Sequence, residues 1–157
     1  MSKFTKKKKG LPAISTASLP DIVFMLLFFF MVTTVMRETD QLVDVNVPTA
    51  TEVKKLERKS LVSYIYVGKP KQKYRAKYGK SDKIQLNDKF ASVKDIGAFI
   101  LAERASKKEE EVPYMTTSIK ADKKASMGII SDIKLELRDV NALKINYATH
   151  KGGDARE

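Results

Sequence analysis

The sequence contains no cysteine and no tryptophan, and it has one histidine in 157 residues. The lack of cysteine excludes a disulfide framework, a thiol nucleophile and a Cys-ligated zinc site. The histidine, His150, stands beside a polar tail, and the seven glycines are too scattered to form a glycine-rich phosphate loop. These absences remove most catalytic arrangements. We therefore expect a protein that is not an enzyme and that holds no metal or cofactor.

Acidic residues are also scarce, and their distribution is uneven. Residues 1–18 hold five lysines and no acid, residues 19–36 hold one acid, and residues 37–157 hold 25 basic and 18 acidic residues. A short lysine-rich flank beside an apolar run predicts a cytoplasmic N-terminus, because short flanking segments follow the positive-inside bias. Long domains cross membranes largely regardless of charge, so the basic C-terminal part does not oppose this orientation.

Long apolar runs are rare as well, and the chain has one, at residues 19–36. Eighteen helical residues extend over about 27 Å, close to the ~30 Å of a hydrocarbon core, so the run predicts a transmembrane helix. A basic start followed by an apolar core is also typical of a cleavable signal peptide. The run ends without a small-x-small cleavage pattern, which favours a retained anchor.

One carboxyl, that of Asp21, interrupts this run. It is either a solvated or helix-capping residue near the interface, or a group that faces a protein interior and exchanges a proton. On a helix it shares a face with Ser18, Phe24, Met25, Phe28 and Val32, and we add Thr33 and Thr34 to this expected contact set. Since the face offers no partner for the acid, we expect the partner to come from another chain.

Residues 37–60 follow as a predicted linker with one short strand. Val43, Val45 and Val47 alternate with polar residues, and the pattern ends before Pro48. Residues 49–60 are polar and indicate a linker or a weak helix. A strand in this position has an open edge that can add to the sheet of another chain. It is equally well an edge strand of its own domain.

Residues 61–150 carry the pattern of a small globular domain. We expect strands at 61–67, 74–78, 84–86, 115–120 and 143–147, and helices at 92–106 and 126–141. The fold class is therefore a single N-terminal transmembrane α-helix followed by a small α+β domain, with a mixed sheet and two helices on one face. Residues 1–18 form a basic cytoplasmic leader in this scheme, and residues 151–157 form a polar tail.

Several motifs together resemble the ExbD/TolR family of proton-driven energy transducers. The run DIVFMLLFFFMVTT from Asp21, with the FMV of residues 30–32, is similar to the membrane segment of that family. The VNVP of residues 45–48 resembles the family's VNLP strand, and the IKAD of residues 119–122 resembles its RAD or KAD segment. Residues 143–145 also fit. The lysine-rich region 69–83 departs from the family pattern.

The resemblance implies a mechanism and a set of partners. Two copies would place their spans inside an ExbB- or TolQ-like polytopic ring, and Asp21 would carry protons as the coupling ion. The chain would cross the bacterial inner membrane once, with its C-terminal domain in the periplasm acting on a TonB-like partner. Val43, Val45, Asn46, Val47 and Pro48 would form the periplasmic coupling strand.

Three other functions are compared with this one. A TolR-like subunit of the Tol–Pal envelope system fits the same resemblance. A passive bitopic anchor, with a basic domain that binds cell-wall or other anionic polymers, fits the charge. Nucleic-acid binding rests on net charge alone and does not agree with the expected location.

Overall fold

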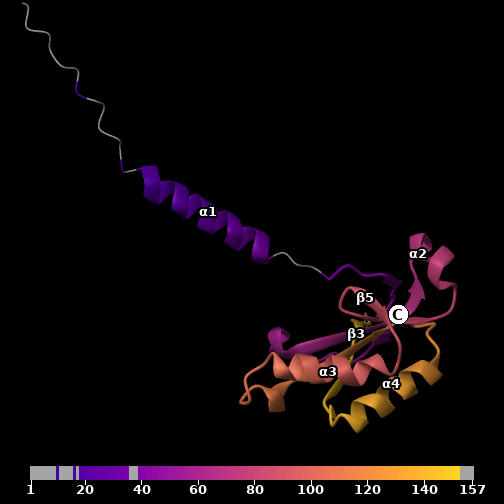
Figure 1. Ribbon diagram of the computed structural model, residues 1–157. Helices are drawn as coiled ribbons and strands as arrows, with labels where there is room; N and C mark the ends of the chain where they lie inside the picture. Colours follow the sequence, from indigo (N-terminus) through magenta and orange to yellow (C-terminus); the bar gives the residue numbers. More distant parts are fainter. Residues whose placement is uncertain (1–9, 11–15, 17, 36–38, 153–157) are drawn as a thin grey trace, which may run out of the picture. The chain divides into compact units, whose positions relative to one another are not determined.

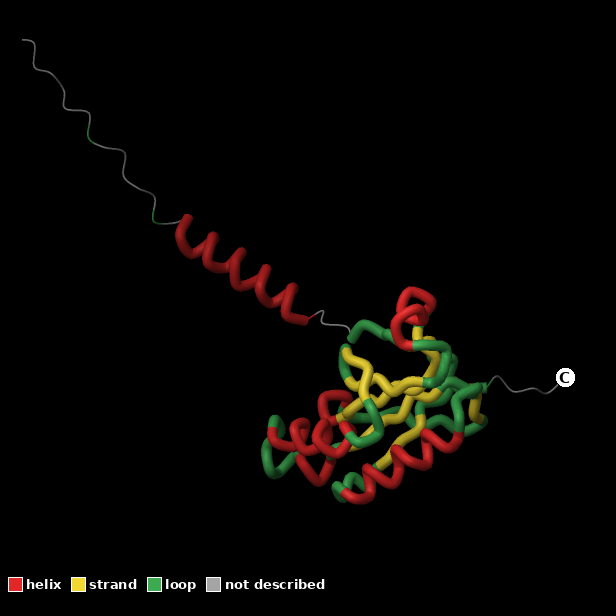
Figure 2. Tube along the Cα trace, turned by 45° about the vertical axis from the view of Figure 1, so that its right-hand side comes forward, coloured by secondary structure: helices red, strands yellow, loops and turns green. Residues whose placement is uncertain are grey.

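The computed structural model describes residues 10, 16, 18–35 and 39–152, without the side chains of residues 34 and 35. The chain divides into two compact units, Met1–Glu38 and Thr39–Glu157. Figures 1 and 2 show a helix in the first unit and a sheet with helices in the second. Most of the predicted basic leader, residues 1–18, lies outside the described residues.

The first unit contains helix α1, Ser18–Val35. Pro20 stands in its first turn, where the missing N–H removes no intrahelical hydrogen bond. The predicted helix is therefore present, and Met36 lies outside the described residues. Among the described residues, however, no helix is both long enough and apolar enough to cross a membrane.

The second unit is built around β3, Val62–Pro70, which is the centre of a mixed sheet with the order β5-β4-β3-β6-β7. The other strands of this path are β4 (Lys83–Leu86), β5 (Lys89–Ala91), β6 (Thr116–Ala121) and β7 (Ile145–Tyr147). Strand β3 pairs antiparallel with β4 and parallel with β6, and β6 pairs parallel with β7. The predicted mixed sheet is confirmed.

Two longer helices, α3 (Asp95–Ala105) and α4 (Met127–Asp139), cover one face of this sheet (Figure 1). The core between these helices and the sheet consists of buried aliphatic side chains: Ile65, Val67, Ile84, Leu86, Ile96, Ile100, Ile119, Ile133 and Leu137. The N–H and hydroxyl of Ser92 both donate to Asp95 at 2.7 Å, which fixes the start of α3 and lowers the pKa of that carboxyl. The predicted α+β architecture is therefore present.

The prediction of a strand at residues 74–78 is wrong, because this segment lies in helix α2, Gln72–Tyr78. Tyr74 and Tyr78 share a face both on a helix and on a strand, so their spacing does not distinguish the two. Packing decides for the helix. The ring of Phe90 lies 5.9 Å from that of Tyr74 and 4.4 Å from that of Tyr78. Two 3₁₀ turns, Lys59–Leu61 and Val112–Tyr114, complete the described helical elements.

The region predicted as a linker belongs largely to the second unit, which begins at Thr39. It contains β1, Val43–Asp44, which pairs antiparallel with the end of β3. It also contains β2, Thr49–Ala50, which pairs parallel with β8, His150–Lys151. The strand predicted at 43–47 is shorter than expected. Of its two interpretations, the edge strand of its own domain is the one that the chain adopts.

Candidate functional site

The surface of α1 is apolar on all sides. The exposed fractions of Phe24, Met25, Phe28 and Val32, all expected to contact a partner, are 71%, 69%, 68% and 50%. Asp21 lies in the first turn of α1, and its carboxylate forms no ion pair with the described part of the chain. A helix with apolar side chains all round requires a cover from lipid or from other helices.

Two further members of the expected contact set are polar. The hydroxyl of Thr33 donates to the carbonyls of Phe29 and Phe30, at 2.9 and 3.0 Å, so the helix itself satisfies this group. Ser18 begins the helix. The side chain of Thr34 lies outside the described residues. Asp21 is thus the ionisable group of α1, and it lies among apolar neighbours.

A second site is formed by residues 40–50, which we call the strap. The side chain of Gln85, which is completely buried, binds the strap at its start. Its Oε1 accepts the N–H of Leu42 at 2.7 Å, and its Nε2 donates to the carbonyls of Asp40 and Asn87 at 2.6 and 2.7 Å. Both polar atoms of the amide therefore form hydrogen bonds, and two of the three bonds go to the strap.

Further contacts hold the middle of the strap. The N–H of Lys71 donates to the carbonyl of Leu42 at 2.9 Å, and Arg75 pairs with Asp44 at 3.2 Å. The N–H of Asn46 donates to Oδ1 of Asp122, while its carbonyl accepts the N–H of Lys123, both at 2.9 Å. These bonds connect the strap to the start and middle of α2 and to the segment that follows β6.

The predicted alternation of the strap is confirmed in its burial. Val43 is completely buried, Val45 and Val47 are half-buried, and the residues between them are exposed. The carbonyl of Pro48, at the end of the pattern, accepts the N–H of His150 at 2.9 Å. The structure therefore brings the predicted coupling-strand residues together on their own domain.

The strap lies on the face of the sheet that α3 and α4 leave open. Ile84 and Leu86 belong to the core, so Gln85 between them points to the opposite face. On that face Lys120 Nζ lies 4.5 and 5.3 Å from the ring centres of Tyr64 and Tyr66. Burial lowers the pKa of Lys120 and raises the pKa of Tyr66. The face is therefore polar but closely packed.

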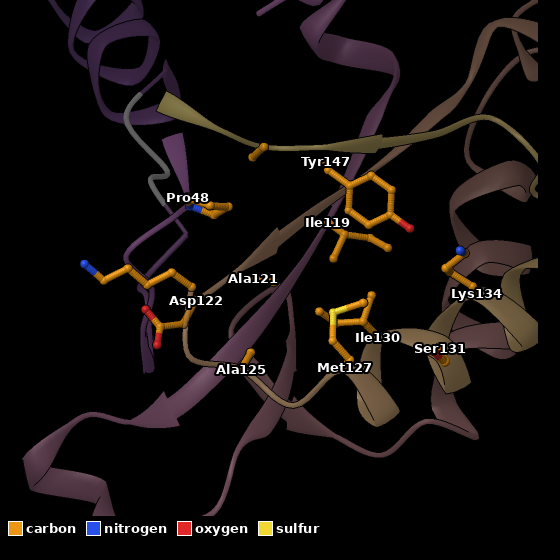
Figure 3. A pocket seen from close by; sticks show the side chains of 12 residues that line it. Pro48, Ile119, Ala121, Asp122, Ala125, Met127, Ile130, Ser131, Lys134 and Tyr147 are labelled. Atoms are coloured by element: carbon orange, nitrogen blue, oxygen red, sulfur yellow. The ribbon is translucent and has the colours of Figure 1, made fainter. Parts of the chain in front are cut away.

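A cavity of about 300 Å³ lies where the strap meets β6, β7 and α4 (Figure 3). Pro48 of the strap, Met127 and Ile130 of α4, and Tyr147 of β7 form apolar walls, and Asp122 stands at its edge. Asp122 thus contacts the strap and lines the cavity. The sequence places Asp122 at the end of the IKAD motif but predicts no contact between it and the strap, and it indicates no role for Gln85.

Metal binding finds no support in the described residues, where no group of three or more His, Cys, Asp or Glu side chains is placed to hold an ion. The features that stand out in the described residues are the single acid of α1 and the strap, which several hydrogen bonds hold on the second unit.

No curated protein matches the chain significantly. The family model described as "Biopolymer transport protein ExbD/TolR" matches residues 7–152, which is nearly the whole chain and includes α1, the strap and the sheet domain. The chain belongs to the ExbD/TolR family of biopolymer transport proteins.

Proposed function

We propose that this protein is an ExbD-like subunit that couples proton flow across the bacterial inner membrane to TonB-dependent outer-membrane transport. Membership of the ExbD/TolR family supports a role in biopolymer transport and its energy supply. The ExbD-like assignment, the TonB-like partner and the inner-membrane location are the proposal itself. The N-terminus is cytoplasmic and the second unit periplasmic in this arrangement.

The observation that carries the proposal is the position of Asp21 on α1. The helix exposes large apolar side chains all round and contains this one ionisable group. An ionised carboxylate in hydrocarbon is costly unless it pairs or faces a polar interior. We therefore place α1 from two copies of the chain inside an ExbB- or TolQ-like ring of helices. The ring supplies the surroundings that the chain itself lacks.

In this arrangement Asp21 carries protons by alternating between its protonated and its ionised state. Desolvation inside the ring favours the neutral carboxyl, and access to water favours the carboxylate. A proton accepted from the periplasmic side removes the charge and allows the dimer to turn within the ring before the proton is released inward. One charge moving through ~100 mV supplies about 2.3 kcal/mol, so several protons drive one mechanical step.

The strap is the proposed coupling element between α1 and the sheet domain. It follows α1 in the chain, and besides the buried side chain of Val43 it is held by hydrogen bonds and an ion pair that can be exchanged for other partners. Release of Val43–Asp44 from β3 would leave both strands with unpaired backbone groups, which can pair with an extended segment of a TonB-like protein. Motion of α1 thus pulls the strap from β3 and frees a strand edge to which the partner can bind.

The test is Asp21→Asn, which preserves size and removes titration. We expect proton-linked transport to fall to the background level while co-purification with the polytopic partner in mild detergent is retained. Asp21→Glu, which keeps a titratable carboxyl, should retain part of the activity. Asp132→Asn, at an exposed position of α4, is the control for loss of an acid elsewhere.

Two outcomes would contradict the proposal. Transport by Asp21→Asn at the level of the unmodified protein would exclude Asp21 as the proton carrier. Absence of any multi-span protein from the detergent-extracted complex would exclude the ring. A passive anchor, by contrast, should tolerate Asp21→Asn in every assay.

A further inference from the structure

We propose that α2 and its flanking lysines bind the anionic lipid headgroups of the membrane next to which the second unit is tethered. This inference rests on the proposed function, since it requires α1 to be in the membrane. Residues 69–83 contain six lysines, one arginine and one acid, Asp82. They include α2, Gln72–Tyr78, which lies on the side of the sheet away from α3 and α4 (Figures 1 and 2).

The charges of this segment are largely unneutralised. Arg75 pairs with Asp44, and Asp82 accepts the N–H of Ser126 at 2.9 Å. Within the described residues, none of the six lysines has a carboxylate within ion-pair distance. Four of them are exposed: Lys69, Lys73, Lys77 and Lys80. The patch is therefore a set of positive charges available to an external anion.

Helix α2 keeps these charges together at a cost to its own stability. Lys73 and Lys77 are four residues apart, a spacing at which like charges repel on a helix. Seven residues are also too few for a stable isolated helix. Contacts on the other side of α2 compensate, because Tyr74 and Tyr78 pack on Phe90 and Arg75 Nε donates to the carbonyl of Pro70 at 2.8 Å. The domain thus presents a fixed basic face.

The position of α2 within its unit favours a membrane over a soluble anion. The carbonyl of Leu42 accepts the N–H of Lys71, Asp44 pairs with Arg75, and the N–H of Asp40 donates to Asp88 at 3.1 Å. These bonds place α2 beside the point where the chain enters the unit from α1. The patch is therefore at the tethered end of the domain.

The tether itself is short. Helix α1 ends at Val35 and the second unit begins at Thr39, so even a fully extended connection reaches only about 14 Å. Electrostatic attraction to an anionic surface extends over about 8 Å at physiological ionic strength. In this proposal the basic patch at the tethered end meets the phosphate headgroups, and each lysine at such a surface strengthens binding about fivefold.

The experiment uses the full chain in vesicles, with one reporter. Because the sequence has no cysteine, Ser81→Cys gives a unique site for a fluorophore beside α2. We expect a headgroup nitroxide lipid to quench this fluorophore in vesicles with 30% phosphatidylglycerol, and much less in pure phosphatidylcholine or in 0.5 M salt. The combined Lys73→Gln, Lys77→Gln and Lys80→Gln variant should weaken the association about a hundredfold and abolish the difference.

The matched control replaces three lysines outside the patch: Lys123→Gln, Lys124→Gln and Lys134→Gln. It lowers the net charge equally and should leave quenching unchanged. Equal quenching in both lipids, or full quenching in the patch variant, would overturn the inference. A fluorescence response to soluble polyphosphate, with none to phosphatidylglycerol vesicles, would overturn the inference and show that the patch binds a free polyanion instead of a membrane.

A second reporter separates this inference from the proposed function. A label at Leu27→Cys on α1 should be quenched by nitroxides on the acyl chains. If it is quenched and the Ser81→Cys label is not, the inference fails while the proposed function stands. If the α1 label is not quenched, the proposed function fails, and the tether required for the inference fails with it.

Discussion

At the scale of single residues, the second unit depends on buried polar contacts as well as on its aliphatic core. Gln85 is completely buried and binds three backbone groups, two of which belong to the strap. Asp122 holds the backbone of Asn46 by a more exposed hydrogen bond. Hydrogen bonds such as those of Gln85 add modest net stability but are expensive to remove, because a buried group then loses its partner. They therefore specify where the strap lies.

We expect Gln85→Ala to lower the free energy of unfolding by about 2–4 kcal/mol, because it leaves three backbone groups without their partner at about 1–3 kcal/mol each, less what water recovers. Urea unfolding followed by circular dichroism measures the loss. Gln72→Ala, at an exposed position of α2, should change stability by less than about 0.5 kcal/mol. Equal effects of the two substitutions would show that Gln85 does not fasten the strap.

Sequence reasoning at this scale identifies residues whose role follows from their own chemistry. Asp21 stands out because an acid in an apolar run needs an explanation, and Ser92 and Asp95 predict the start of α3 because the capping pattern is local. Gln85 could not be identified. Its role depends on Leu42 and Asp40, which lie more than forty residues earlier in the chain.

At the scale of elements, the contact between β1 and β3 depends on a glycine. A Cβ at Gly68 would fall inside the van der Waals distance of the carbonyl oxygen of Asp44 in β1. Since that atom belongs to the backbone of a paired strand, it cannot turn aside as a flexible side chain does. Gly68 thus permits the close approach of the strap to the central strand.

We expect Gly68→Ala to displace β1 from β3 while leaving the rest of the sheet intact. Hydrogen exchange should then increase at least tenfold at the amide of Asn46 and along residues 40–46, and a protease should cleave there earlier. Gly128→Ala is the control. A Cβ there meets Ser126 Oγ at an ordinary 3.6 Å, and alanine is a better helix former than glycine. Unchanged exchange in the strap of Gly68→Ala would contradict this account.

The sequence predicts helices and strands well where the apolar residues of a segment follow one spacing, either helical or alternating. The helical spacing of Ile96 and Ile100, and of Ile130, Ile133 and Leu137, gives α3 and α4. Helix α2 is missed because tyrosines four residues apart suit both periods. Strands β1, β2 and β8 have two residues each. Only their partners make them strands, so no local pattern could predict their bounds.

At the scale of the whole molecule, the strap connects the first unit to the sheet domain along the chain. If α1 moves during transport, the strap must either carry the domain with it or detach from β3. The pairing of Asp44 with Lys69 provides a way to distinguish the two, because the chain has no cysteine of its own. Opposite residues of antiparallel strands have Cα atoms about 4.5–5.5 Å apart, within the range of a disulfide.

We expect the double variant Asp44→Cys and Lys69→Cys to form this bond under oxidising conditions and to lose transport activity, since β1 can no longer leave β3. Reduction should restore activity to the level of the two single variants, which also control for loss of the Arg75 pair. Full activity of the oxidised form, with the bond verified by mass spectrometry, would show that the strap transmits motion without detaching.

The pairing of β2 with β8 has a consequence for how the domain is made. Thr49 pairs with His150, about a hundred residues later in the chain, so this contact cannot form until the end of the domain has been synthesised. Lys71, Gln85 and Asp122 hold the start and middle of the strap and are all synthesised before β8, so only the β2 end has to wait for the last strand. The β2 end is therefore the last part of the strap to gain its partner.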